Sequence, residues 1–218
     1  ISDVDVDGSG RMYLSAWAGA GYKGNPGKGY VERVVPKNWK YVPFPKLAEL
    51  KDDALIKGLT SKSSTARLHV QQEILKRTDS AAKNAPAILA LAKDSKNSKE
   101  SRVAAIFTYA QLLGEKSFNG LAELTKDNAL REFALRAMTD RRPIASKAPV
   151  APFLAGLKDK NPRTQVAAAV GLGRIGKVET ANALLAVAIP PAPMKPSTQK
   201  GHQGGPHATP HSAVVVPH

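Results

Sequence analysis

Three aspartates alternate with valines at the start of the chain and have the spacing of cation ligands. Asp3, Asp5 and Asp7 occupy every second position of DVDVDGSG, and Gly8 follows them. Alternate carboxylates followed by a glycine form the first half of a calcium loop of the EF-hand type. The position that should carry a bidentate glutamate is Leu14, and a strand-like segment follows, so we expect no EF-hand. The alternatives are a different calcium loop within a β-hairpin and a plain Asp-Gly turn.

A second candidate metal site lies near the end of the chain. The segment 190–218 is rich in Pro, Gly and His and carries His202, His207 and His211, with His218 beyond them. Imidazoles bind zinc or copper and can ligate haem iron. No cysteine or carboxylate accompanies them, and no rigid element fixes their geometry. The competing interpretation is an irregular segment that packs on the rest of the protein.

Four arginines recur at a nearly constant interval in the middle of the chain. Each opens the second of two short apolar helical runs, and the gaps between them are 35, 29 and 32 residues: Arg67, Arg102, Arg131 and Arg163. Such a period with paired amphipathic helices is typical of an α-solenoid. Arginines on one ridge could also bind phosphates. We expect Lys76-Arg77 and Arg141-Arg142 to form exposed positive patches.

The elements expected to position these residues are mostly helical. Two strands are predicted at Met12–Trp17 and Tyr30–Val35, separated by a glycine-rich loop. The predicted helices end at Gly114, Pro143 and Gly176 among other breaks. They are Leu47–Leu59 with Ser64–Lys76, Ala85–Lys93 with Lys99–Leu113, Phe118–Lys126 with Ala129–Met138, Lys147–Leu157 with Pro162–Ile175, and a last helix at Glu179–Ile189.

The predicted organisation has four parts. Residues 1–36 form a β segment, 37–46 a linker, 47–190 the helical array and 191–218 an irregular segment. Trp39, Tyr41 and Phe44 are expected to hold the linker on the first helices. Because the chain starts with Ile1 in the middle of a motif, we expect it to be a piece of a longer polypeptide.

Composition narrows the range of functions. The 218 residues include no cysteine, which excludes thiolate metal sites, a cysteine nucleophile and covalent CxxCH haem attachment within this chain. No apolar run is long enough for a membrane span. The net charge is +14, and residues 47–190 carry 23 basic and 14 acidic side chains. A basic array of this kind binds nucleic acid in some proteins and has a merely solvated surface in others.

The helical stretch resembles HEAT repeats, most clearly in LAGLKDKNPRTQVAAAVGLGRIG at Leu154–Gly176. The resemblance implies an armadillo-like α-solenoid in which a turn aspartate and a second-helix arginine form a ladder between units. The residues that match this pattern, each aspartate four positions before its arginine, are Asp127 with Arg131 and Asp159 with Arg163.

The N-terminal stretch ISDVDVDGSGRMYLSAW with GKGYVERVVP resembles the closing blade of a β-propeller of the glucose/sorbosone dehydrogenase-like type. A propeller blade that continues into HEAT repeats is similar to the multidomain membrane-bound dehydrogenase-like proteins of the PVC bacterial group. That resemblance implies a periplasmic or secreted parent protein with sugar- or alcohol-oxidising activity and a c-type haem outside this chain. It assigns no redox role to any residue here.

The function expected from these observations is that of a non-catalytic scaffold or protein-interaction module. The fold class is mostly α, an α-solenoid with a short β segment left from a propeller blade. The expected partners are a protein or the flanking domains of the same polypeptide. The chain itself needs no cofactor on this account, with calcium at the three aspartates and zinc or copper at the histidines as the candidate ions. The alternative is a basic HEAT-repeat protein that binds nucleic acid.

Overall fold

A three-stranded antiparallel sheet occupies the N-terminal part of the chain. The computed structural model describes residues 3–17 and 27–188. The strands β1 (Asp3–Val6), β2 (Met12–Trp17) and β3 (Gly29–Val34) lie in the order β1-β2-β3. The prediction for β2 is confirmed with the same bounds, and β3 begins and ends one residue earlier than predicted.

The strand β1 was not predicted, because its alternating aspartates were interpreted as a turn or a loop. Val4 and Val6 supply the β-branched residues of this strand and pair with Leu14 and Met12. Asp3 accepts a hydrogen bond from the backbone N–H of Val4 at 2.8 Å, as Asp5 does from Val6 at 2.7 Å. The period of two in DVDV therefore marks a strand, and only the GSG that follows it is the turn.

One face of this sheet is apolar. Residues directly opposite each other in an antiparallel pair lie on the same face. The observed register therefore places together Val4, Val6, Met12, Leu14, Ala16, Tyr30 and Val34, with Glu32 as the one charged member. Val4 is 51% exposed and Tyr30 is 46% exposed. The apolar side chains on this face of the sheet are therefore partly exposed to water.

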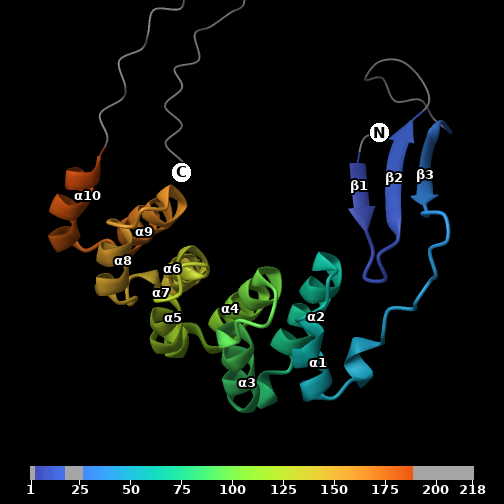
Figure 1. Ribbon diagram of the computed structural model, residues 1–218, viewed down its shortest axis with the longest axis horizontal. Coiled ribbons are helices and arrows are strands. Elements are labelled where there is room, and N and C mark those ends of the chain that lie inside the picture. Colours follow the sequence, from blue (N-terminus) through green and yellow to red (C-terminus); the bar gives the residue numbers. More distant parts are fainter. Residues whose placement is uncertain (1–2, 18–26, 189–218) are drawn as a thin grey trace, which may run out of the picture. The chain divides into compact units, whose positions relative to one another are not determined.

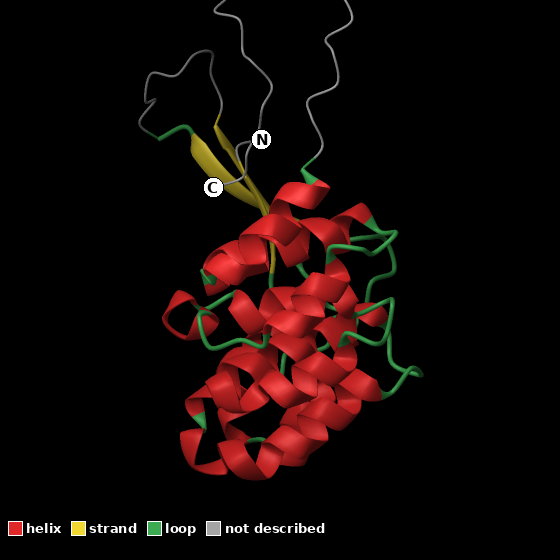
Figure 2. Ribbon diagram, turned by 90° about the vertical axis from the view of Figure 1, so that its left-hand side faces the viewer, coloured by secondary structure: helices red, strands yellow, loops and turns green. Residues whose placement is uncertain are grey.

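The rest of the described chain is mostly helical (Figures 1 and 2). The longer helices are α2 (Ser64–Lys76), α3 (Ala81–Lys93), α4 (Lys99–Leu113), α6 (Arg131–Thr139) and α9 (Pro162–Ile175). The shorter ones are α1 (Asp52–Gly58), α5 (Phe118–Leu124), α7 (Arg142–Ala145), α8 (Val150–Gly156) and α10 (Ala181–Val187). The predicted bounds of α2, α4 and α9 are confirmed.

The helices pack as consecutive pairs. Helix α1 contacts α2, α3 contacts α4, α5 contacts α6, and α8 contacts α9. The second helices also touch in sequence, α2 with α4, α4 with α6 and α6 with α9 (Figure 1). A single cluster of buried apolar side chains runs through these pairs, and its fully buried members include Leu55, Ile88, Ile106, Leu135 and Phe153.

Two glycines end helices as predicted. The chain turns at Gly114 after α4 and at Gly176 after α9, where φ is +54° and +72°. A side chain with a Cβ is disfavoured in that region of backbone conformation. The breaks expected at Gly114 and Gly176 are therefore confirmed, and the reason is the backbone angle.

Prolines lie at or inside three helices whose bounds differ from prediction. Pro143 was predicted as a break, but it lies in the first turn of the short helix α7, where no N–H is required. Pro149 delays the start of α8 to Val150. Pro86 lies inside α3, which begins at Ala81 and not at the predicted Ala85.

The two ends of the array also differ from prediction. The expected first helix is divided into a 3-10 turn at Leu47–Glu49 and α1. Leu50 is extended between them. The last expected helix, Glu179–Ile189, is a 3-10 turn at Val178–Thr180 followed by α10.

Aromatic residues of the linker 37–46 contact both of its neighbours. The rings of Phe44 and His69 of α2 lie 5.8 Å apart between centroids, so Phe44 holds the linker on the first helices. Tyr41 was expected to contact the first helices but contacts the turn between β1 and β2. Its ring lies 4.6 Å from the guanidinium of Arg11 and 6.0 Å from the ring of Trp39.

By contacts, the chain divides into two units, Ile1–Val187 and Ala188–His218. Everything described above belongs to the first unit. Of the second unit, the structure describes only Ala188. Among the described helices, none combines the length and apolar character that crossing a bilayer requires.

Candidate functional site

The carboxylate of Asp7 organises the turn between β1 and β2. One oxygen accepts hydrogen bonds from the backbone N–H groups of Ser9 at 3.0 Å and Arg11 at 2.9 Å, and from the Ser9 hydroxyl at 2.6 Å. The other oxygen accepts from Nε of Arg11 at 2.6 Å. The Ser9 hydroxyl, together with the N–H and guanidinium of Arg11, holds the pKa of Asp7 well below its usual range.

Asp3, Asp5 and Asp7 do not converge on one point in this structure. The first two bond to the N–H groups of their own neighbours, and Asp7 bonds within the turn. Within residues 3–17 and 27–188, no three acidic or imidazole side chains are grouped closely enough to hold a metal ion. The geometry therefore corresponds to the Asp-Gly turn, one of the two alternatives from the sequence. His202, His207 and His211 lie outside the described residues.

Three of the four recurring arginines bond within their own helix pair. Nη1 of Arg67 donates to the carbonyl of Ser61 at 2.6 Å, and Nε of Arg131 donates to the carbonyl of Thr125 at 2.6 Å. Nε of Arg102 donates to the carbonyl of Ala92 at 2.8 Å. Each carbonyl lies near the end of the preceding helix, where carbonyls lack partners within the helix. The arginines thus bind the turn that joins the two helices of a pair.

Two of these arginines also bind an aspartate of the following pair. Nη2 of Arg102 donates to Asp127 at 2.6 Å, and Nη1 of Arg131 donates to Asp159. The second oxygen of each aspartate accepts a backbone N–H two residues later, from Ala129 at 2.8 Å or Asn161 at 2.7 Å. Each aspartate therefore shapes its own turn and ties that turn to the pair before it.

These contacts show how the predicted ladder residues are arranged. Arg131 bonds to Asp159, and Asp127 accepts from Arg102. The spacing of four residues therefore gives the position of each residue within its helix pair, and the two residues four apart do not bond to each other. Arg163 bonds to Glu132 of the preceding pair, through Nε at 2.9 Å and Nη2 at 3.1 Å.

Gln165 and Glu132 belong to this arrangement but were not found from the sequence. Nε2 of Gln165 donates to the carbonyl of Asp159 at 2.7 Å, six residues earlier. Arg67 and Arg131 make the same bond at the same offset. In α9 the position that holds the turn is therefore occupied by glutamine. That offset of six residues is the pattern that would have revealed it.

The electrostatic environment of the two ladder aspartates favours their charged form. Burial opposes the ionisation of Asp127, but bonds from Arg102 and the Ala129 N–H outweigh it and lower its pKa. The pKa of Asp159 is also lowered, mainly by the hydrogen bond from the Asn161 N–H and secondly by the hydrogen bond from Arg131. Both carboxylates therefore stay ionised and bound at neutral pH, as a structural link requires.

Arg77 departs from the expected positive surface patch. Its side chain is only 22% exposed and donates to the carbonyls of Leu47 at 3.0 Å and Leu50 at 2.7 Å. It also bonds to Asp52 at 3.0 Å and Glu73 at 3.1 Å. The prediction of an exposed patch is wrong for Arg77, because this guanidinium joins the start of α1 to the end of α2.

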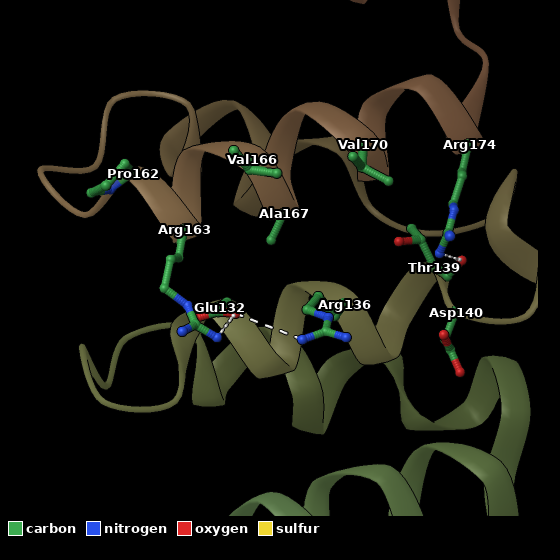
Figure 3. A pocket seen from close by; sticks show the side chains of 10 residues that line it. All are labelled: Glu132, Arg136, Thr139, Asp140, Pro162, Arg163, Val166, Ala167, Val170 and Arg174. Carbon is green, nitrogen blue, oxygen red and sulfur yellow. Dashed lines mark hydrogen bonds and ion pairs between the residues drawn. The ribbon is translucent and has the colours of Figure 1, made fainter. Parts of the chain in front are cut away.

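A groove runs between α6 and α9 (Figure 3). It encloses about 440 Å³. Along α9 it is lined by Val166, Ala167 and Val170, and the two valines are exposed. Three arginines surround these aliphatic side chains: Arg136 of α6, and Arg163 and Arg174 of α9. The groove combines an apolar floor with a basic rim, which suits non-covalent recognition.

No protein-family model matches the chain, and a search of curated proteins found no match. Within the described helices, the four recurring arginines bind acidic side chains or backbone carbonyls. What this arrangement does chemically is hold helix pairs together and present a groove.

Proposed function

We propose that this chain is a non-catalytic scaffold and protein-interaction module, built as an α-solenoid of HEAT-like helix pairs. The observation that supports it most is the pair of ion bonds that cross from one helix pair to the next, Arg102 to Asp127 and Arg131 to Asp159. In solenoids, each repeat is stabilised chiefly by its neighbours. Bonds of this kind link each repeat to the next.

The mechanism of such a scaffold is geometric. The continuous apolar cluster and the cross-pair bonds keep successive pairs in a constant relation, so the array sets a distance between whatever is attached at its two ends. The second helices form a row from α2 to α9, and a partner can lie along that row. No chemical step is required of any residue in the array.

The apolar face of the N-terminal sheet supports the proposal of a flanking domain. A sheet of three short strands is stabilised when one face is covered by another sheet or a helix. Val4, Met12, Tyr30 and Val34 are at least 40% exposed on that face. We propose that it packs in the parent protein as a propeller blade against its neighbour.

The proposed parent is a larger secreted or periplasmic redox protein, with sugar or alcohol oxidation and any c-type haem outside these residues. The intact mass and the full sequence of the native polypeptide test this. A parent that extends well beyond both ends and contains CxxCH agrees with the proposal. A native chain bounded near Ile1 and His218 contradicts it.

The scaffold proposal is tested by the distance between the ends of the array. Because the chain has no cysteine, the exposed positions Lys57 and Lys177 can be changed to cysteine and labelled with donor and acceptor dyes. Single-molecule energy transfer should give one narrow distribution. The variant Arg131→Ala should broaden it, whereas Arg142→Ala, an exposed change in α7, should not. A broad distribution in the unmodified array would contradict a rigid scaffold.

A second candidate function, nucleic-acid binding, is favoured by the net charge of +14. Such binding would weaken steeply with salt, because each phosphate contact releases counterions. Gel-shift titrations with duplex DNA at low and physiological salt test it. Binding that survives physiological salt would support this function over the scaffold.

A further inference from the structure

We infer that the groove between α6 and α9 binds a short extended peptide in which acidic side chains alternate with aliphatic ones. This inference deepens the proposed interaction function and depends on the array holding α6 beside α9.

The composition of the groove matches such a peptide. Val166 is 54% exposed and Val170 is also exposed on the same side of α9, four residues further on. Residues four apart on a helix lie on one face, so the valines form an apolar strip. Single exposed valines are ordinary, but here two lie in line in one groove. The volume of that groove, about 440 Å³, is in the range of ligand-binding sites.

The arginines on the rim keep N–H groups for a ligand. Arg163 uses Nε and Nη2 for Glu132, and its side chain is 70% exposed, so three of its five N–H groups stay available. Arg136 lies 3.7 Å from Glu132, which is beyond hydrogen-bond distance, and is 55% exposed. Arg174 uses Nη1 for the carbonyl of Thr139 at 3.1 Å.

The balance of charge in the groove is positive. Three arginines face one carboxylate, Glu132, whose side chain is only 11% exposed and is bound by Arg163. Asp140 also lines the site, but its side chain is directed away from α9 (Figure 3). Carboxylates suit the planar, two-pronged donors of arginine. An acidic ligand would therefore complement the rim.

The length of the groove sets the size of the ligand. Arg163 and Arg174 are eleven residues apart on α9, which corresponds to about 16 Å at the helical rise of ~1.5 Å per residue. An extended peptide advances about 3.3 Å per residue. The groove therefore accommodates about five residues. In an extended peptide, successive side chains point to opposite sides, so acidic and aliphatic residues can reach rim and floor separately.

Charge disfavours two other candidate occupants, and the aliphatic floor disfavours a third. A second copy of this chain carries the same net charge of +14 and would be repelled. The segment 189–218 of the chain itself contains Lys195 and Lys200 but no acidic residue. Nucleic acid is less suitable, because the floor is aliphatic and offers no aromatic ring for a base to stack on.

The test uses the whole chain and a fluorescein-labelled heptapeptide of sequence GLEVELG. Fluorescence anisotropy should detect saturable binding, with GLQVQLG and GLKVKLG at least about tenfold weaker. Arg136→Glu should also weaken binding about tenfold. The matched control Arg142→Glu makes the same charge change on α7, outside the groove, and should leave the dissociation constant within about twofold.

Each contrary result has a distinct meaning. Equal weakening by Arg136→Glu and Arg142→Glu, or full displacement of the peptide by an oligothymidylate, would show general attraction of anions and overturn the site. Absence of binding, or equal binding of GLQVQLG, would overturn it as well. A rigid array in the energy-transfer experiment together with no peptide binding would reject the groove and leave the scaffold proposal standing.

Discussion

At the scale of single residues, the guanidinium of Arg131 joins three places in the chain. It lies at the start of α6, donates to the carbonyl of Thr125 in its own pair, and bonds to Asp159 of the next pair. We predict that Arg131→Ala lowers the free energy of unfolding by about 1–3 kcal/mol, because the change leaves partly buried acceptors without donors. Urea denaturation measures this.

The control variants for this residue separate charge from geometry. Arg142→Ala removes an exposed arginine and should change the free energy of unfolding by less than about 0.5 kcal/mol. Arg131→Lys keeps the charge but loses the two-pronged donor. Its loss of unfolding free energy should therefore lie between those of Arg142→Ala and Arg131→Ala. A cost for Arg142→Ala as large as that for Arg131→Ala would contradict the structural role of the Arg131 contacts.

The same residues predict a pH dependence of stability. The pKa of Asp159 and of Asp127 lies below the ordinary value of 3.8 in the folded chain. A lowered pKa in the folded state means that the stabilisation is present above pH ~4 and is lost as the pH falls through the folded pKa. We predict that Asp159→Asn is less stable than the unmodified chain near neutral pH and that this difference shrinks below pH ~4.

Urea midpoints measured at a series of pH values test this prediction. Asp140→Asn, at an exposed position, is the control. A difference between Asp159→Asn and the unmodified chain that stays constant through the acid range would show that the ion bond contributes nothing.

Sequence reasoning found the residues of the ladder better than their pairing. The offset of four between Asp127 and Arg131, repeated at Asp159 and Arg163, is visible in the sequence. The bonds join residues 25 or 28 apart, because each arginine points to the next pair. Such a distance becomes visible only when the stacking of the pairs is known.

At the scale of elements, two glycines on α9 have opposite surroundings. A Cβ on Gly171 would lie 2.2 Å from the ring of Phe153, which is fully buried in α8, whereas a Cβ on Gly173 would meet nothing within 4 Å. We predict that Gly171→Ala lowers the free energy of unfolding by about 1–3 kcal/mol, because the ring has no room to move. Gly173→Ala should raise it by about 0.5–1 kcal/mol, since alanine favours the helix.

Thermal and urea unfolding of both variants check this pair. The two changes are chemically identical and two residues apart on one helix, so helix propensity alone predicts the same effect. Stabilisation by both would mean that α8 does not pack on α9 at Gly171.

Elements were predictable where local residues determine their ends. Ser63, Ser98 and Asn161 cap α2, α4 and α9 with side-chain bonds to N–H groups of the first turn, and these helices have the predicted bounds. Helices without such a cap, among them α1, α5 and α8, differ from prediction at one or both ends. Their ends depend on packing between helices, which the local sequence does not record.

At the scale of the whole molecule, the groove is the feature that the sequence could not predict. It requires α6 and α9, which lie in different pairs, to face each other across Glu132 and Arg163. The sequence indicates this groove only in part, because it places two valines and two arginines on one face of α9. The paired apolar runs and the arginine interval indicate paired helices, so the mostly helical class was predictable and the site was not.

The measurement that tests the proposed stack of pairs most directly is small-angle X-ray scattering of a chain ended after Ala188, which keeps the described helices. A compact globular chain of that length has a radius of gyration of about 16 Å. An open stack of helix pairs predicts a clearly larger radius and a pair-distance distribution with a long tail. A radius near 16 Å with a symmetric distribution would indicate a closed bundle and contradict the scaffold account.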